Sequence, residues 1–186
     1  MMGRRLVWIA VAALAAAALL VWALRGGPGP AETAPEEVIE VSTPTPAPEE
    51  RVVLLYPGRD GMLHPELRIV PLPSEVDHRV RVVLRELLSG SQEGRAPVLP
   101  YKAEVLGVFI DGAGHAFVDL TAPPEPMTGS HSELMLVYGV VNSILLNCPE
   151  LHSVQVLFSG HEVSTLTGHL DLSHPLALNK RLIASS

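Results

Sequence analysis

The chain has eight histidines, all between residues 64 and 174, and their imidazole groups could bind a metal ion or transfer protons. His115, His161 and His169 each follow a glycine, and with Asp171 they could in principle ligate a metal ion. No pair of them has the helical three-residue spacing or the H-E-x-x-H pattern of zinc sites. Histidines in turns usually bond to water or to local backbone, so we expect no metal site.

Hydrolytic chemistry would require a nucleophile, a base and an acid that orients the base. The residues that could supply them are Ser130, His131 or His161, and Asp119. An adjacent Ser-His pair does not bring the imidazole well onto the hydroxyl, and the chain has no G-x-S-x-G elbow. We expect Asp119 and Asp171 to accept backbone N–H bonds in turns instead. The sequence therefore predicts no catalytic residues and no enzyme activity.

The remaining groups give little support for a cofactor or a nucleic acid. The Asp111–Gly114 segment is too short and has too few carboxylates for a calcium loop. The single cysteine, Cys148, excludes an intramolecular disulfide and is expected to be a small buried residue. A formal net charge of −7, without a glycine-rich phosphate loop or a basic patch, argues against nucleic acid.

The elements that would position these groups follow a ββα–ββα–β order, and the apparent repetition of ββα is too diverged to be an internal repeat. In the first half, β-branched and apolar residues predict strands over Val52–Tyr56 and Leu67–Leu72. A helix follows, with Ser74 as its cap and Asp77 as part of a capping box, and ends at Ser89-Gly90. Its apolar stripe consists of Val76, Val80, Val83, Leu84 and Leu87.

The second half repeats this order after a proline-containing loop. A hairpin is expected from Val105–Ile110 and His115–Leu120, then a helix over Ser130–Asn147 and a strand over Val154–Phe158. The tail Val163–Leu178 is expected to be mostly extended. The order ββα–ββα–β predicts an α/β (α+β) domain of two layers, in which two helices cover one face of a mixed sheet.

The second helix carries no charge between Leu134 and Cys148, so it is apolar on all sides. Such a helix is usually buried on more than one side. Leu136, Val140 and Ser143 lie opposite or beside its core stripe and are the candidate interaction face for a protein partner or a second copy. The alternative is that the C-terminal tail covers this face.

The N-terminal region predicts export. Leu6–Leu24 is a run of nineteen uncharged residues, long enough at about 1.5 Å per residue to span a bilayer. Arg4 and Arg5 precede it, which predicts a cytoplasmic N-terminus and a C-terminal domain outside the membrane. The alternative is a signal peptide that is cleaved, which would release a secreted protein.

Residues 26–50 contain six prolines, six glutamates and no aromatic residue, and predict a disordered linker. The sequence therefore predicts three parts. These are a cytoplasmic tip with a signal-anchor over residues 1–25, the linker over 26–50, and one folded domain over 51–186.

The folded part resembles the GerMN domain of sporulation and spore-germination proteins over about residues 52–178. Four segments carry the resemblance in order: Leu54-Leu55-Tyr56-Pro57 with Gly61-Met62-Leu63, Leu84–Leu88 with Gly90, Ala116-Phe117-Val118-Asp119-Leu120, and Gly160-His161-Glu162-Val163 through Leu166-Thr167-Gly168-His169-Leu170-Asp171-Leu172-Ser173. No single segment is diagnostic, and the order and spacing together make the likeness. Thr121 departs from the family, which often has Ser after Asp-Leu.

The resemblance implies a domain similar to the ring-building motif, carried by anchored or lipidated proteins outside the bacterial membrane. It implies a non-catalytic module that assembles with protein partners or with itself, in sporulation, in germination or in the envelope generally. The second hypothesis is a domain that binds a small molecule or a cell-wall fragment. The third is an enzyme, and it has the least support because no catalytic residues can be transferred.

Overall fold

The computed structural model describes residues 16, 20–22, 24, 47–123 and 130–185 of the chain. The chain divides into two units, residues 1–44 and 45–186. In the first unit the described residues are helical, and Leu20 and Trp22 are each 63% exposed. Within the described parts, no helix has both the length and the apolar character that crossing a bilayer requires. Most of the predicted span Leu6–Leu24 and of the predicted linker 26–50 lies outside the described residues.

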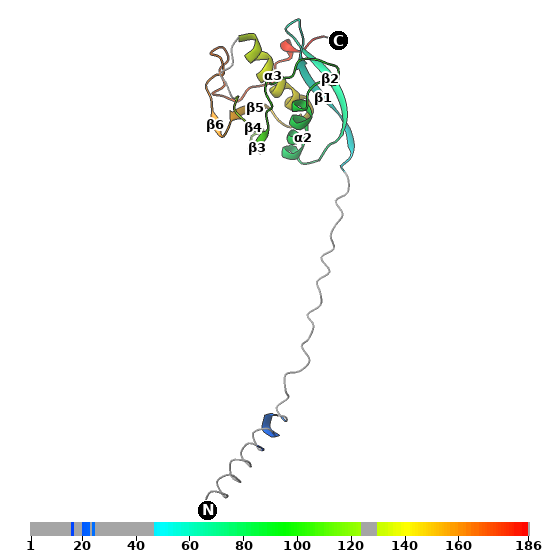
Figure 1. Cartoon of the computed structure of the whole chain (residues 1–186), viewed down its shortest axis with the longest axis vertical. Helices are drawn as coiled ribbons and strands as arrows, with labels where there is room; N and C mark the ends of the chain where they lie inside the picture. Colours follow the sequence, from blue (N-terminus) through cyan, green and yellow to red (C-terminus); the bar gives the residue numbers. More distant parts are fainter. Residues whose placement is uncertain (1–15, 17–19, 23, 25–46, 124–129, 186) are drawn as a thin grey trace, which may run out of the picture. The chain divides into compact units, whose positions relative to one another are not determined.

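The second unit opens with an antiparallel hairpin of β1 (Glu49–Pro57) and β2 (Leu63–Pro71), which Figure 1 shows along one side of the domain. Both predicted strands are present, and both are longer than expected. β1 begins two residues before the expected start of the domain at Arg51, because Glu49 and Glu50 pair with Pro71 and Val70. The Leu72 N–H also donates to the Pro48 carbonyl at 2.9 Å.

A second sheet contains β3 (Val105–Ile110), β4 (His115–Leu120), β5 (Ser153–Phe158) and the short β6 (His161–Glu162), in that order. β4 and β5 are parallel, and the other neighbours are antiparallel. The expected single mixed sheet is therefore wrong: the β1–β2 hairpin forms a sheet of its own. Predicted bounds and structure agree for β3 and β4, because the Asp111–Gly114 turn is encoded locally.

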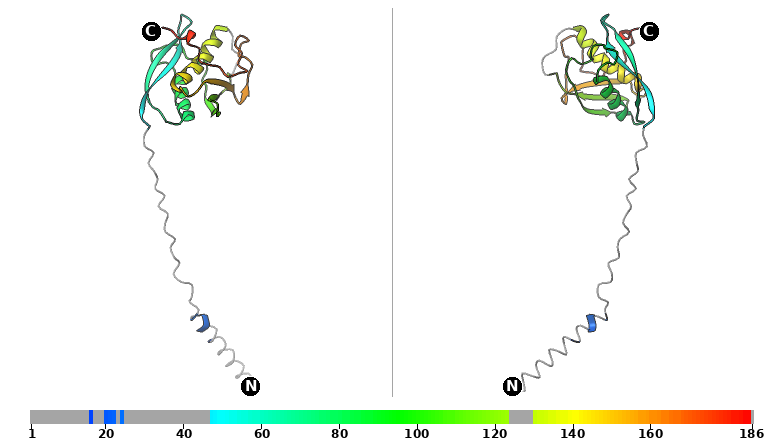
Figure 2. Two further views of the ribbon diagram at one scale, coloured as in Figure 1. Left: turned by 180° about the vertical axis from the view of Figure 1, so that it is seen from behind. Right: turned by 45° about the vertical axis from the view of Figure 1, so that its right-hand side comes forward.

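Two helices contact strands of both sheets: α2 (Val76–Leu88) and α3 (Ser130–Asn147). Figure 2 shows them between the hairpin on one side and the four-stranded sheet on the other. The helices therefore have strands on two sides and do not cover one face of a single sheet. The N-cap of α2 is Glu75, which makes no side-chain capping bond, so the expected cap at Ser74 is wrong.

The free edge of β1 is bonded to α3 rather than to a strand. The Leu55 N–H donates to Ser143 Oγ at 3.0 Å, and the Val53 N–H donates to Asn147 Oδ1 at 2.9 Å. Asn147 Nδ2 donates in return to the Val53 carbonyl at 2.8 Å. Gly139 lies one turn before Ser143, and a Cβ there would come 3.0 Å from Val98 Cγ1 and 3.4 Å from the Leu55 carbonyl oxygen. The missing side chain therefore lets Val98 and β1 lie close to α3.

This packing overturns the candidate interaction face on α3. Val140 and Ser143 are fully buried, and Leu136 is 2% exposed. The tail is only part of the cover, since the hairpin bonds directly to Ser143. A helix that is apolar all round is buried here by two sheets, so these three residues cannot meet a partner without unfolding.

The C-terminal tail is less extended than expected. It forms an isolated bridge of Leu176 with Val154, then a short 3-10 helix, η1 (Lys180–Leu182), and then a second isolated bridge of Ile183 with Leu63. Asn142 of α3 holds the segment before η1, because its side chain accepts from the Asn179 N–H and donates to the Asn179 carbonyl, both at 2.9 Å. The chain end then meets the start of β2, where the Ala184 N–H donates to the Leu63 carbonyl.

Candidate functional site

The histidines considered as metal ligands bond to separate parts of the domain. His115 Nδ1 lies 2.6 Å from Ser153 Oγ, and His161 Nδ1 lies 2.7 Å from the Ser159 carbonyl. His169 Nδ1 lies 3.2 Å from Thr167 Oγ1. In the part of the chain that the structure describes, no three His, Cys, Asp or Glu side chains are grouped so that they could hold a metal ion.

Asp119, on β4, and Asp171, in the loop before Ser173, both accept backbone N–H bonds, as expected. Asp119 Oδ1 accepts from the Gly160 N–H at 2.9 Å, and Asp171 Oδ1 accepts from the Ser173 N–H at 2.9 Å. Cys148 is fully buried, and this burial raises the pKa of its thiol to about 12. The side chains of Ser130 and His131 lie outside the described residues.

Glu133, in the first turn of α3, is a fully buried carboxylate that the sequence analysis did not single out. It collects six hydrogen bonds from the loop 165–170. Four come from the backbone N–H groups of Leu166, Thr167, His169 and Leu170, and two from the hydroxyls of Thr165 and Thr167, with distances of 2.6 to 3.2 Å.

These donors decide the charge of Glu133. Burial alone would raise its pKa, but the hydroxyl and backbone donors outweigh burial and lower the pKa to about 2. Each oxygen accepts three hydrogen bonds, so the carboxylate has no free lone pair for a substrate. Glu133 therefore fixes the loop 165–170 against α3 and is not an acid–base group.

A second buried carboxylate, Glu66 on β2, lies beside Arg68 on the same strand. Arg68 Nη2 donates to Glu66 Oε1 at 2.8 Å, and Arg68 Nη1 donates to the Glu86 carbonyl at 2.8 Å near the end of α2. Glu66 also accepts from the Ser91 hydroxyl at 2.5 Å and from the Gln92 N–H at 3.0 Å. The pair thus joins β2 to the C-terminus of α2 and to the loop after it.

The electrostatics of this pair are those of a structural junction. Burial would raise the Glu66 pKa, but the hydrogen bonds from Ser91, Gln92 and Arg68 lower it to about 2. The Arg68 cation lies at the C-terminal end of α2, where a positive charge complements the helix dipole. Tyr56 completes the cluster, and burial raises the pKa of its hydroxyl to about 12.

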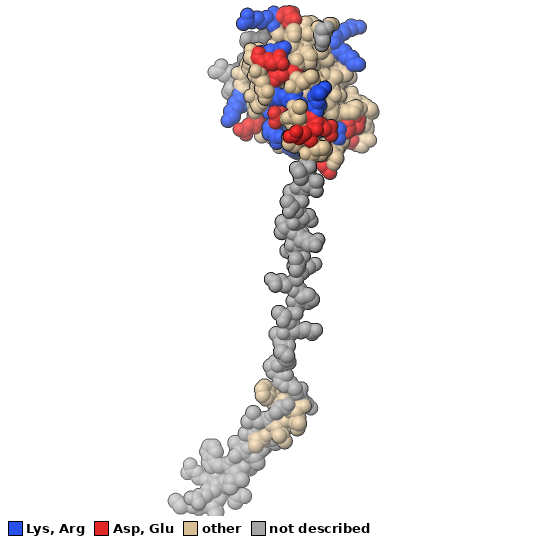
Figure 3. Space-filling view, turned by 90° about the vertical axis from the view of Figure 1, so that its right-hand side faces the viewer, with Lys and Arg blue, Asp and Glu red and all other residues tan. Residues whose placement is uncertain are grey.

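The exposed apolar surface lies elsewhere, and one part of it is on the hairpin. Leu67 and Ile69 of β2 are 59% and 69% exposed, and their cross-strand partners are Val53 and Arg51. Cross-strand partners share one face of a sheet, so these four residues form a continuous surface, the hairpin patch. Figure 3, which views the domain from the hairpin side, shows acidic and basic side chains with uncharged surface between them.

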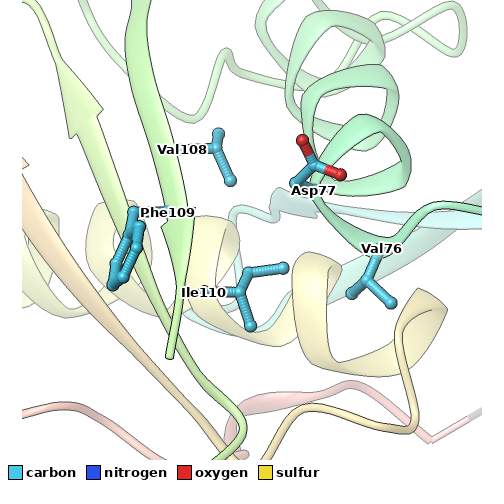
Figure 4. Close-up of a pocket in the computed structure, with 5 residues that line it drawn as sticks. All are labelled: Val76, Asp77, Val108, Phe109 and Ile110. Atoms are coloured by element: carbon cyan, nitrogen blue, oxygen red, sulfur yellow. The ribbon is translucent and has the colours of Figure 1, made fainter. Parts of the chain in front are cut away.

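A hollow of about 380 Å³ lies beside β3 and is lined by Val76, Asp77, Val108, Phe109 and Ile110. Figure 4 shows Val108 and Ile110 on the side of β3 that faces Val76 and Asp77 at the start of α2, and the Phe109 ring on the opposite side of the strand. Phe109 is 64% exposed, and its ring centroid lies 6.0 Å from that of Phe117. We call this surface the β3 hollow.

Alternation of apolar and polar residues along β2 shows that Leu67 and Ile69 share one face, but it does not show which face is buried. In the sequence Leu67-Arg68-Ile69, an ion-paired residue lies between two aliphatic ones, which hides which face is buried. Only the burial of Arg68, 6% exposed, shows that the aliphatic side chains face outward. Glu133 gave no such signal, because its donors lie more than thirty residues away.

This architecture defines a small α/β domain whose buried acids are structural and whose surface carries some exposed apolar side chains among the charged ones. The chain belongs to the Germane family, described as sporulation and spore germination, whose model matches residues 53–164. The resemblance to the GerMN domain is thereby confirmed over those residues. Comparison with curated proteins yields no match.

Solved structures share the fold. A candidate lipoprotein from Clostridium perfringens is 20% identical, with a TM-score of 0.51 over 73% of this chain and 93% of that one. The tandem GerMN domains of the sporulation protein GerM from Bacillus subtilis are 19% identical, with a TM-score of 0.53 over 70% of this chain. The match covers 46% of that tandem structure. At these identities the likeness shows the fold alone.

Proposed function

We propose that this chain is a membrane-anchored interaction module of the bacterial envelope, which assembles proteins outside the membrane and catalyses no reaction. The observation that carries the proposal is that the buried charged groups are bonded internally, while several apolar side chains are exposed. The buried carboxylates Glu66 and Glu133 are saturated by internal donors, whereas Leu67, Ile69 and Phe109 are each more than half exposed. Exposed apolar surface of this kind is typical of protein contacts.

Three further points support the location and the process. The uncharged run Leu6–Leu24, after Arg4 and Arg5, is expected to anchor the chain with its C-terminal domain outside. One protein of the same fold is named as a candidate lipoprotein, which is consistent with a place at the envelope. The family description connects the module with sporulation and spore germination.

The alternative, a domain that binds a small molecule or a wall fragment, lacks an observation in its favour. Such sites combine an apolar pocket with several convergent polar groups. Among the described residues, the β3 hollow offers one carboxylate, that of Asp77, beside apolar side chains. A contact with protein side chains suits this lining better.

The test uses the full-length chain in bacterial membranes. Cross-linking of intact cells, followed by detergent extraction and sizing, should give species larger than one chain. Protease added to protoplasts should digest residues 51–186. A single uncross-linked species at every expression level would contradict the assembly function. Full protection of the domain from protease would contradict the location.

A further inference from the structure

We propose that the loop 165–170 is a receptor for a carboxylate anion, and that the side chain of Glu133 is the ligand built into it. The inference goes beyond the proposed assembly function and does not depend on it. A binding site that belongs to the loop should survive the loss of the Glu133 side chain and take a free carboxylate of the same size. Acetate and propionate are the probes of that chemistry.

The six donors of the loop are divided evenly between the two carboxylate oxygens. Oε1 accepts from the Thr165 hydroxyl and from the N–H groups of Leu166 and Thr167, at 2.7 to 3.1 Å. Oε2 accepts from the Thr167 hydroxyl and from the N–H groups of His169 and Leu170, at 2.6 to 3.2 Å. Two oxygens at a fixed separation fit this arrangement, whereas a single spherical ion such as chloride cannot reach both sets of donors.

The loop is held in shape by hydrogen bonds that do not involve Glu133. Across its base, the Leu172 N–H donates to the Ser164 carbonyl at 2.8 Å. Inside it, the Gly168 N–H donates to Thr165 Oγ1 at 2.7 Å, which leaves the hydroxyl hydrogen of Thr165 for the carboxylate. Gly168 has a φ of 92°, and a left-handed residue within a turn lets neighbouring N–H groups converge on an anion. We therefore expect the donors to stay in place when the Glu133 side chain is removed.

The loop holds the anion through dipoles rather than through a full cation. Within the described parts of the chain, the basic group in ion-pair range of Glu133 is His169, whose Nδ1 lies 3.9 Å from Oε2 and whose side chain is 55% exposed. Oriented N–H and O–H donors stabilise an ionised carboxylate where it is shielded from water. Selectivity should therefore come from the shape of the anion and not from its charge alone.

The size of the ligand follows from the length of the side chain that fills the site. Glu133 is fully buried, so the space it leaves is bounded by packed atoms. Glu133→Ala removes a CH₂–COO⁻ group, which acetate matches. Glu133→Gly removes one more methylene, and propionate then matches. Propionate is too long for the alanine variant, because overpacking a filled site is unfavourable.

Thermal melts of the full-length chain in a neutral detergent at pH 7 test the receptor, with sodium acetate compared with sodium chloride at equal ionic strength. Glu133→Ala should melt several degrees below the parent in chloride, and acetate should recover a large part of that loss because it binds the folded state alone. Glu133→Gln still fills the site and should not respond to acetate. Glu162→Ala, exposed on β6, is the matched control and should not respond either.

The match of anion size to side-chain length gives an independent readout. Acetate should raise the melting temperature of Glu133→Ala more than propionate does, and the order should reverse in Glu133→Gly. Folding of Glu133→Ala in acetate but not in chloride would also support the receptor. Failure to fold in both salts would overturn it, since a preformed site would be filled at high acetate concentration. An equal shift in parent, Glu133→Gln and Glu133→Ala would mean a general salt effect and would overturn it too.

Discussion

The negative charges of two buried glutamates of this domain are stabilised in different ways. Glu66, 3% exposed, forms an ion pair with the Arg68 guanidinium and accepts further hydrogen bonds from the loop after α2. Glu133, fully buried, relies on six N–H and O–H donors of one loop, and its nearest basic atom is His169 Nδ1 at 3.9 Å. A set of oriented dipoles can thus keep a buried carboxylate ionised as effectively as a cation does.

The two arrangements differ in what they connect. The Glu66–Arg68 pair joins β2 to the end of α2, so losing it would loosen two elements of the core. Glu133 joins α3 to the loop 165–170 alone. We therefore expect that loop to open to water before the sheets unfold. We therefore expect damage at Glu66 to be global and damage at Glu133 to be partly local.

The largest effect should come from acid, which acts on both sites at once. Both carboxylates have a folded pKa of about 2 against an ordinary 4.5, so their stabilisation is complete above pH 4.5 and is lost as the pH falls toward 2. The loss is at most about 3 kcal/mol for each site. Urea unfolding of residues 45–186 between pH 7 and pH 2.5 should show this decline. A constant free energy of unfolding would contradict both pKa shifts.

Arg68→Met should be the most damaging single change, because it leaves Glu66 as an unpaired buried charge. We expect the free energy of unfolding to fall by about 3–5 kcal/mol at pH 7. Arg95→Met is the matched control, since Arg95 lies 4.0 Å from the same carboxylate with a side chain that is 26% exposed. The control should change stability by less than about 0.5 kcal/mol. Equal losses of stability in the two variants would mean that Arg68 contributes no more than Arg95 to compensating the Glu66 charge.

Glu133→Gln should cost about 3 kcal/mol, because the amide nitrogen cannot accept the bonds of three donors. Hydrogen exchange should quicken first in residues 165–170, and the acid sensitivity of stability should decrease by about half. Glu162→Gln, at an exposed site on β6, should leave both unchanged. If hydrogen exchange quickened throughout the core as early as in residues 165–170, the damage at Glu133 would be global, like that expected at Glu66.

A smaller loss of stability is expected where two elements are joined by an uncharged hydrogen bond, as α3 and β1 are by Ser143. Ser143→Ala removes the acceptor of the Leu55 N–H at the buried edge of β1, which should cost about 1–2 kcal/mol in urea unfolding. Ser173→Ala, at an exposed turn, should cost much less. A loss as large as that of Glu133→Gln would show that charge is not what separates these sites.

Chelation should have no effect, because Glu133 is satisfied by the donors of the loop. Thermal melts of residues 45–186 with and without EDTA should coincide. A drop of several degrees with EDTA would indicate that a metal ion, held by Glu133 and a histidine such as His169, contributes to holding the loop. Both glutamates would then be stabilised by a cation, Glu66 by the Arg68 guanidinium and Glu133 by the metal ion.

Local patterns predicted much of the fold, because the forces involved act within a few residues. Alternation and the Asp111–Gly114 turn determine β3 and β4, and the uncharged stretch before Pro149 determines α3. In the turn after β5, Ser159 and Gly160 both have positive φ, as a two-residue hairpin turn of type I′ requires. The candidate surfaces were not predicted, because exposure depends on which elements cover a residue.

The sequence by itself determined the order of strands and helices, the family and the predicted export signal, because periodicity, turn residues and the uncharged run Leu6–Leu24 are local properties. The tertiary structure decided that β1 bonds to Ser143 and Asn147 instead of joining the second sheet. It also decided that α3 is buried on both sides, which removed Leu136, Val140 and Ser143 as a contact face. These outcomes depend on partners up to 94 residues apart, and no local pattern encodes the pairing of such distant groups.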